Sequence, residues 1–293
     1  MTLRDSGKMV PGIVVYTAVF GDIGDCLRRP QNVPPEVPLH AYTDEVTEPT
    51  PSNGWTLLPP VWHDEDPRRR NRHHKLLSHR LYPEAEYTLY VDGSLTPHVD
   101  PNELIERYLG RYDICLFKNA GRNCIYEELE ACTRWGKDDP AIMRSQIDRY
   151  RSEGYPAGHG LVEAGAVLRR HSQTIHKLNE AWWHEVSTGS KRDQLSFNYV
   201  AWKMSLEYAT FAGRATYNPY FAWREHPDEM LQNAWVAYWR RNWEEFYELR
   251  ERLADYAADA EVQRLLNQKV YPRWVYPIKD FFDRLKGSAG SRR

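Results

Sequence analysis

The sequence has few cysteines, no long apolar run and no excess of charge of one sign. Its four cysteines form no C-x-x-C pair and no spacing typical of a zinc site, which favours a reduced protein of the cytoplasm. A disulfide between Cys124 and Cys132 stays open on sequence alone. The 39 basic and 41 acidic residues nearly balance, so composition gives no reason to expect nucleic acid or another polyanion as a partner.

Segments that would place the chain in or across a membrane are also missing from the sequence. No stretch approaches the roughly 18 consecutive apolar residues of a spanning helix. The residues before Pro11 include Asp5 and no apolar segment of signal-peptide length. We therefore expect a cytoplasmic protein without a secretion signal.

The length of 293 residues suits one large α/β domain with a small appendage. After His226, long aromatic-rich amphipathic patterns replace alternating strands and helices, so we expect one domain over residues 1–226 and a helical extension over residues 227–293. Aromatics such as Trp235 and Trp239 in that extension suit packing on the core, on a second copy of the chain, or peripherally on the inner membrane face.

Within residues 1–226, apolar β-branched runs alternate with segments of helical periodicity, which indicates an α/β fold with a mostly parallel sheet flanked by helices. An Asp-Pro pair at Asp66 and Pro67 marks one helix start. The expected strands are 13–20, 40–44, 55–58, 87–92, 113–117 and 160–169. The expected helices are 66–81, 101–109, 125–135, 140–153, 172–185 and 193–206.

The most informative run is Tyr87–Val91, an apolar segment that ends abruptly in Asp92 and Gly93. In open α/β sheets, ligands bind beyond the carboxyl ends of the strands, so Asp92 is well placed to meet a substrate or a metal. An Asp-Gly pair after a strand is also a common turn, and that interpretation stays open.

The helix after Pro67 carries a basic face. Arg68, Arg72, Lys75 and His79 fall at i, i+4, i+7 and i+11, which places them on one side. Such a face is either simply solvated or a clamp for a diphosphate, because guanidinium groups match phosphate oxygens. Nucleic-acid binding is disfavoured, since no aromatic residues interleave with these charges.

A further pair, Asp193 and Gln194, opens an apolar run downstream. By itself it reads as a helix N-cap. The pair becomes a stronger candidate for a functional site because the strand with Glu163 and Gly165 precedes it, with one expected helix between them. Asp92 and Asp193 are also a candidate carboxylate pair for glycoside hydrolysis, although a hydrolase has no need of the basic helix.

Taken together, these segments resemble the nucleotide-diphospho-sugar transferases of the GT-A (Rossmann-like) fold. More closely, they resemble the glycosyltransferase-like family that includes plant pollen-turgor and seed-mucilage proteins and their bacterial relatives. The resemblance covers roughly residues 12–226 and rests on five motifs in order, at residues 15–22, 72–83, 90–94, 154–163 and 192–197.

The resemblance implies a role for each motif. The turn after the first strand would contact the nucleoside, the basic helix the diphosphate, and the Asp92 motif the ribose or a divalent metal. The donor-binding residues are then Thr17, Ala18, Phe20, Arg72, Lys75, Asp92, Gly93 and Ser94. Asp193 and Gln194 would contact the donor sugar on its reacting side, and Glu163 would line the acceptor side, which makes these three the expected catalytic residues.

One position departs from the family pattern. Ser94 stands where an Asp-x-Asp motif has its second carboxylate, and hard cations prefer several oxygen ligands. The resemblance makes Asp92 and His226 the candidate metal ligands, and whether Mn²⁺ or Mg²⁺ is a cofactor stays open.

The expected function is transfer of a sugar from a nucleoside diphosphate sugar to a hydroxyl of a glycan, a lipid-linked or a small-molecule acceptor. A non-catalytic nucleotide-sugar-binding protein is the alternative, because the second carboxylate is missing at Ser94. A glycoside hydrolase is a third hypothesis.

Overall fold

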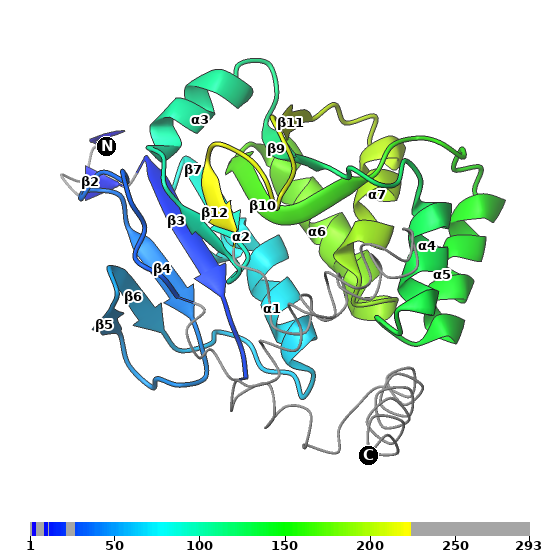
Figure 1. The fold of residues 1–293 in the computed structure, drawn as a ribbon, viewed down its shortest axis with the longest axis horizontal. Coiled ribbons are helices and arrows are strands. Elements are labelled where there is room, and N and C mark those ends of the chain that lie inside the picture. The colour runs from blue at the N-terminus through cyan, green and yellow to red at the C-terminus, as the bar shows by residue number, and fades with distance from the viewer. Residues whose placement is uncertain (1, 4–8, 11, 22–26, 224–293) are drawn as a thin grey trace, which may run out of the picture. The chain divides into compact units, whose positions relative to one another are not determined.

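The computed structural model describes residues 2–3, 9–10, 12–21 and 27–223 (Figure 1). The chain divides into two units, Met1–Arg224 and Glu225–Arg293. The second unit lies outside the described residues. The expected C-terminal helices, their contacts with a second copy or a membrane, and the metal-ligand assignment of His226 therefore stay predictions.

An eight-stranded mixed sheet forms the centre of the described part of the chain (Figure 1). Its order is β11-β9-β10-β7-β3-β4-β6-β5. Four pairs of neighbouring strands are parallel: β3 with β4, β3 with β7, β4 with β6, and β9 with β11. The other three pairs are antiparallel: β10 with β7, β10 with β9, and β5 with β6. The strands are β3 Ile13–Ala18, β4 Leu39–Tyr42, β5 Thr50–Ser52, β6 Trp55–Leu58, β7 Tyr87–Val91, β9 Ile114–Lys118, β10 Val162–Arg170 and β11 Ala209–Phe211.

Two shorter antiparallel pairs complete the described strands: β1 Thr2–Leu3 with β2 Met9–Val10, and β8 Leu95–Pro97 with β12 Phe221–Trp223. The helices are α1 Pro67–Leu76, α2 Ser78–Leu81, α3 Pro101–Tyr108, α4 Ile125–Arg134, α5 Pro140–Ser152, α6 Gln173–Thr188 and α7 Phe197–Lys203, with a 3₁₀ turn η1 at Asp193–Leu195. The structure thus confirms the expected α/β class with helices flanking a sheet.

The sheet separates two apolar clusters, because successive side chains of a strand point to opposite faces. Tyr16 and Tyr90 belong to the cluster that includes residues of α1, α4, α5 and α6. Val15 and Leu89, one position earlier on the same strands, belong to the cluster that includes Leu104 of α3. The central strands are buried on both faces, which explains their continuous apolar sequence.

Local sequence accounts for three helix starts. Asp66, Asp100 and Asp139 each precede a proline, and each carboxylate accepts a hydrogen bond from the backbone N–H two residues later. This capping satisfies a donor that a helix leaves unpaired at its first turn, and the proline has the right φ for that position.

Two expected helices differ from the structure. The helix predicted over residues 66–81 is interrupted at Leu77, whose φ of −100° and ψ of 42° separate α1 from α2. Both Leu76 and Leu77 are fully buried, and the interruption lets consecutive side chains reach the core. His79 therefore belongs to α2, and the basic stripe predicted from Arg68 to His79 does not continue along one helix.

The helix predicted over residues 193–206 is likewise divided, into η1 and α7, with Ser196 between them. The Ser196 hydroxyl donates to the Asp193 carbonyl at 3.2 Å. This local bond competes with a regular helical turn.

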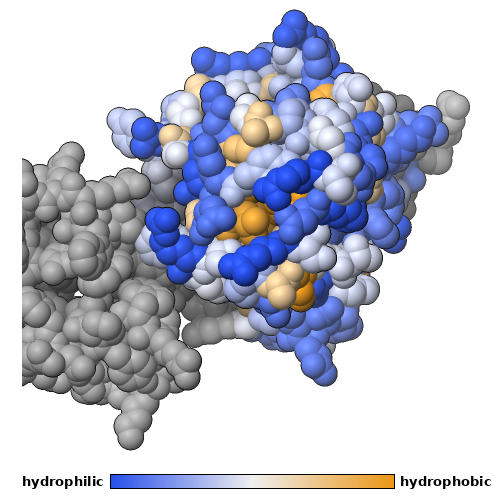
Figure 2. All heavy atoms as spheres, turned by 90° about the vertical axis from the view of Figure 1, so that its right-hand side faces the viewer, coloured by the Kyte–Doolittle hydropathy of each residue, from blue (hydrophilic) through white to orange (hydrophobic). Residues whose placement is uncertain are grey.

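The three described cysteines, Cys115, Cys124 and Cys132, are free, so the disulfide left open between Cys124 and Cys132 is not formed. In the described ranges, every helix is too short or too polar to cross a bilayer. Figure 2 shows that the face on the right-hand side of Figure 1 is mostly hydrophilic, with hydrophobic residues in small separate patches, as is ordinary for a protein surface.

Candidate active site

The candidate site lies at one edge of the sheet, where β3 and β7 end side by side. Because these strands are parallel, Ala18 at the end of β3 lies near Asp92, which follows β7. Strand β10 runs the opposite way, so its first residues return to the same edge. The Asp92 N–H donates to the Gly165 carbonyl at 2.7 Å, and Glu163 lies two residues before Gly165, near the start of β10. The structure therefore brings together motifs that lie about 70 residues apart in the sequence.

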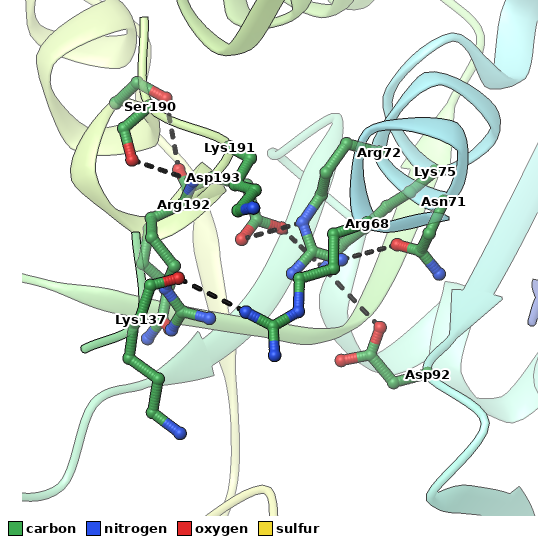
Figure 3. A network of polar contacts seen from close by, with 12 residues as sticks. Arg68, Asn71, Arg72, Lys75, Asp92, Lys137, Ser190, Lys191, Arg192 and Asp193 are labelled. Carbon is green, nitrogen blue, oxygen red and sulfur yellow. Dashed lines mark hydrogen bonds and ion pairs between the residues drawn. The ribbon is translucent and has the colours of Figure 1, made fainter. Parts of the chain in front are cut away.

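Asp193 lies beneath this edge and is buried, with a side chain only 3% exposed. Its Oδ2 lies 2.7 Å from Nζ of Lys75, and its Oδ1 lies 3.2 Å from Nε of Arg72 (Figure 3). The carboxylate caps no helix, since η1 has no side-chain cap. Asp193 instead shares its charge between two cations of α1, and the helix-cap interpretation is wrong.

The segment that carries Asp193 is fixed from three sides. Arg69 donates to the Gly189 carbonyl at 3.0 Å, and the Ser190 N–H donates to Oε1 of buried Gln146 at 2.9 Å. The indole N–H of Trp182 donates to the Asp193 carbonyl at 3.0 Å. These bonds hold the segment between α6 and α7 against α1 and α5, so the position of the carboxylate is determined by packing.

Electrostatics keep Asp193 ionised. Burial by itself raises the pKa of its carboxyl, but the positive charges of Arg72, Lys75 and Arg192 outweigh that effect and hold the pKa below its usual range. Asp193 is therefore a buried negative charge at neutral pH, compensated by its neighbours.

Asp92 is the more accessible carboxylate, with a side chain 35% exposed. Its Oδ1 accepts a hydrogen bond from the Tyr90 hydroxyl at 2.8 Å and lies 3.6 Å from Nζ of Lys75. Asn71 of α1 donates to the Tyr90 hydroxyl at 3.0 Å and also to the carbonyl of Ala18. This chain of contacts fixes Asp92 relative to both α1 and β3.

Gln194 lies next to these groups and is half-buried. Its Nε2 donates to the Val162 carbonyl at 3.2 Å, and its Oε1 accepts from Arg192 at 2.9 Å. Arg192 also faces Glu128 at 3.8 Å. The amide of Gln194 is thereby attached to the first residue of β10.

Glu163 sits where β10 loses regular register with β9. It pairs with Phe117, and the register shifts between Glu163 and Leu168. Such irregularities turn side chains at the rims of sheets. Burial raises the pKa of the half-buried Glu163 carboxyl, with Arg122 opposing that effect. Glu163 is thus a carboxyl with a raised pKa at the same sheet edge.

The turn expected to contact the nucleoside is only partly exposed. Thr17 and Ala18 are each 1% exposed, so their side chains face the core. Phe20 is half-buried, and its ring lies 5.0 Å from that of His74 and 5.2 Å from the Arg70 guanidinium carbon.

Sequence reasoning did not single out Asp44. Its carboxylate accepts from Gly21 N–H at 3.2 Å and pairs with Arg70 at 3.0 Å. Asp44 comes two residues after the end of β4, and Asp92 comes directly after β7, so a carboxylate shortly after a buried strand was the available signal. Asn71 and Tyr90 offered no comparable signal, because their roles depend on contacts across the sheet edge.

The described residues do not provide an obvious metal site. They contain no group of three or more His, Cys, Asp or Glu side chains that could hold an ion. Of the two expected ligands, Asp92 is partly committed to Tyr90 and Lys75, and His226 lies outside the described residues. Ser94 is half-buried and adds at most a hydroxyl.

Comparison with named proteins finds two relatives from Arabidopsis thaliana. "Probable hexosyltransferase MUCI70" is 31% identical over 226 residues, which cover 68% of this chain and 38% of the relative. "Alkaline ceramidase TOD1" is 28% identical over 137 residues, which cover 43% of this chain and 30% of the relative. The chain thus spans well under half the length of either protein.

Among solved structures, mouse xyloside xylosyltransferase 1 aligns with a TM-score of 0.39 and 12% identity over 69% of this chain and 85% of that one. The WbbM bifunctional glycosyltransferase aligns with a TM-score of 0.38 and 12% identity over 71% of this chain and 40% of that one.

A family model provides the assignment. The model of the TOD1/MUCI70 glycosyltransferase-like domain matches residues 61–215, which include Arg72, Lys75, Asp92, Glu163 and Asp193. That segment is more than half of the chain and contains every element around the buried Asp193 carboxylate. The chain therefore belongs to the TOD1/MUCI70 glycosyltransferase-like domain family.

Proposed function

We propose that the chain transfers a sugar from a nucleoside diphosphate sugar to a hydroxyl of a glycan, lipid-linked or small-molecule acceptor. The observation that carries the proposal is the sheet edge itself, where a partly exposed carboxylate, Asp92, lies beside the cationic face of α1 and opposite Glu163 of β10. The family assignment and the hexosyltransferase name of the MUCI70 relative support it.

In this proposal Arg72 stabilises the leaving diphosphate. Its side chain is 14% exposed, and its Nε and Nη1 face Asp193 and Asn71. These contacts hold the guanidinium plane in one orientation. A preorientated cation is most useful where negative charge develops during bond cleavage, as on a departing diphosphate.

Asp193 is then a positioning residue. Its side chain is almost fully buried and engaged by two cations, so it acts on a substrate through Arg72 and Lys75. The same burial argues against the glycoside hydrolase hypothesis, because that chemistry needs two carboxyl groups that both face the glycosidic bond.

Glu163 is proposed to face the acceptor, and Gln194 the donor sugar. The acceptor oxygen forms a bond to the anomeric carbon, the bond from that carbon to the diphosphate breaks, and the hydroxyl proton must leave the oxygen. A carboxylate whose pKa is raised by burial is a better proton acceptor than an ordinary glutamate. Gln194 would supply an amide hydrogen bond that orients the donor sugar.

The experiment is a nucleotide-release assay on the full chain with UDP-sugars and GDP-sugars, and with a CMP-sugar as the donor that lacks a diphosphate. We expect release from one diphosphate donor, faster with an acceptor than without. Asp92→Asn should reduce release by about tenfold or more, whereas the exposed control Asp148→Asn should not. Tight donor binding without release under any condition would identify the non-catalytic binding protein instead.

A further inference from the structure

We infer that the ammonium group of Lys75 takes the place of a divalent cation at this site, and that Asp92 contacts a donor hydroxyl directly. The inference rests on the proposed function and deepens it. It starts from one arrangement: Asp92 at the sheet edge and the buried Asp193 face the same buried lysine. Nζ of Lys75 lies 2.7 Å from Oδ2 of Asp193 and 3.6 Å from Oδ1 of Asp92 (Figure 3).

The position of this ammonium is fixed. The Lys75 side chain is 2% exposed, and Nζ lies 5.1 Å from the centroid of the Tyr90 ring, a cation–π contact. Lys75 lies in the last turn of α1, next to fully buried Leu76 and Leu77. It cannot leave its position without opening the core, so its amino group stays beside Asp92. Burial lowers the pKa of Lys75, and the negative charges of Asp193 and Asp92 oppose that effect.

A divalent cation does not fit the described residues around Asp92. Mn²⁺ and Mg²⁺ require about six oxygen ligands and favour carboxylates. Oδ1 of Asp92 already accepts from Tyr90 and faces Lys75, and the second carboxylate, Asp193, is neutralised by Lys75 and Arg72. A metal bound to the free oxygen of Asp92 would also face the ammonium, and like charges repel.

The free oxygen of Asp92 is open to a hydroxyl. Oδ2 lies 3.6 Å from the position that a Cβ on Gly165 would occupy, so the glycine leaves this oxygen uncovered. The carboxylate is 35% exposed in spite of its contacts. A carboxylate that presents one free oxygen is a strong acceptor for a sugar or ribose hydroxyl. Lys75 thus supplies the positive charge that a divalent cation would bring, and Asp92 binds the donor hydroxyl.

The first experiment is Mn²⁺ titration of the full chain, followed by electron paramagnetic resonance with and without UDP. Because the full chain is used, any contribution of His226 is included. We expect wild-type protein to leave Mn²⁺ free, and Lys75→Met to bind it, since that variant removes the ammonium that faces both Asp92 and Asp193. Lys177→Met, at an exposed position of α6, is the matched control and should behave as wild type. Tight Mn²⁺ binding by wild type that is lost in Asp92→Asn or His226→Ala overturns the inference.

The second experiment is calorimetry of donor binding in Mn²⁺ and in EDTA. Affinity should differ by less than about twofold between the two conditions, and a Mn²⁺ requirement of about tenfold or more would contradict the inference. If no nucleotide sugar binds in either condition, the proposed function fails. The Mn²⁺ titration of the protein alone still decides the role of Lys75 in that case, and it does not require a folded Lys75→Met variant.

Discussion

Replacing Asp193 by asparagine removes the negative charge that two buried cations share while keeping the shape of the side chain. In the wild type, Lys75 and Arg72 lie 2.7 and 3.2 Å from this carboxylate. Asparagine can still accept one hydrogen bond, but it leaves Lys75 with only the more distant Asp92, at 3.6 Å. Two positive charges then lie close together in the core without full compensation.

The expected cost follows from the burial of the network. Removing one partner of a buried ion pair costs about 3–5 kcal/mol. Because Asp92 retains part of the compensation, we expect a loss near the lower end, about 3 kcal/mol. For a domain of about 200 residues, that corresponds to a fall in Tm of about 6–12 °C.

The stability difference between wild type and Asp193→Asn should also depend on pH, in a direction set by the pKa of Asp193. The folded pKa of Asp193 is lowered, so its contribution to stability is fully present above the unfolded pKa of about 3.9 and is lost as the pH falls through the folded pKa. The difference in stability between wild type and Asp193→Asn should therefore be constant near neutral pH and shrink below about pH 3.9.

The assay is calorimetric and urea unfolding of both proteins between pH 7 and pH 3. Asp148→Asn serves as the control, because Asp148 is 67% exposed in its pair with Arg151 and should contribute less than about 1 kcal/mol. An unchanged Tm for Asp193→Asn at pH 7 would refute the compensated-charge argument. A stability difference that persists undiminished at pH 3 would show that the loss does not come from the charge of the carboxylate.

Three further predictions concern stability and access to the site. Burial lowers the pKa of His74 to about 4, and its ring both donates to and accepts from the backbone. The unfolded chain therefore binds more protons than the folded one. The free energy of unfolding, measured with urea, should fall as the pH is lowered from about 6.5 to about 4. Gly189→Ala should lower stability by about 1–3 kcal/mol, because its Cβ would lie 2.5 Å from a buried glutamine nitrogen, whereas Gly110→Ala has free space and should melt as wild type. Gly165→Ala meets only ordinary contacts and should keep its Tm, but its methyl group would cover Oδ2 of Asp92, so calorimetry should show weaker donor binding.

Much of the fold could be predicted because its signals are local. The Asp-Pro starts of α1, α3 and α5 involve adjacent residues, and the runs that became β3 and β7 are apolar on both faces. A strand buried on both faces must lie inside a sheet, and the carboxylate that follows it must lie at the edge. This is why Asp92 could be placed at the edge of the sheet from sequence alone.

The direction of β10 could not be predicted in the same way. Its residues Val162–Arg170 have the same apolar pattern whichever way the strand runs, and its neighbours are set by contacts with β7 and β9. Strands β5, β8, β11 and β12 have three residues each, too few for a periodic signal. The prediction of a mostly parallel sheet was therefore correct in outline, but it did not include the antiparallel direction of β10, which brings Glu163 to the site.

The candidate site shows the same limit. The sequence placed Arg72 and Lys75 on one helix face and singled out Asp193, but nothing in it pairs positions more than 115 residues apart. The pairing depends on α1 packing against α6 and on the bonds that Arg69 and Trp182 make to the segment that carries Asp193. A local pattern identifies residue types, and only the packed chain decides which of them are buried partners and which face solvent.

The buried network is better explained by orientation than by stability. A well-packed apolar replacement of a buried ion pair is often as stable as the pair itself, so the fold alone does not require Lys75 and Asp193. What an apolar core could not provide is a fixed direction for the two charged groups above it. Arg72 and Asp92 are both tied to this network and both remain partly exposed at the sheet edge. The ions in the core therefore hold in place the two groups to which the proposed function assigns the donor.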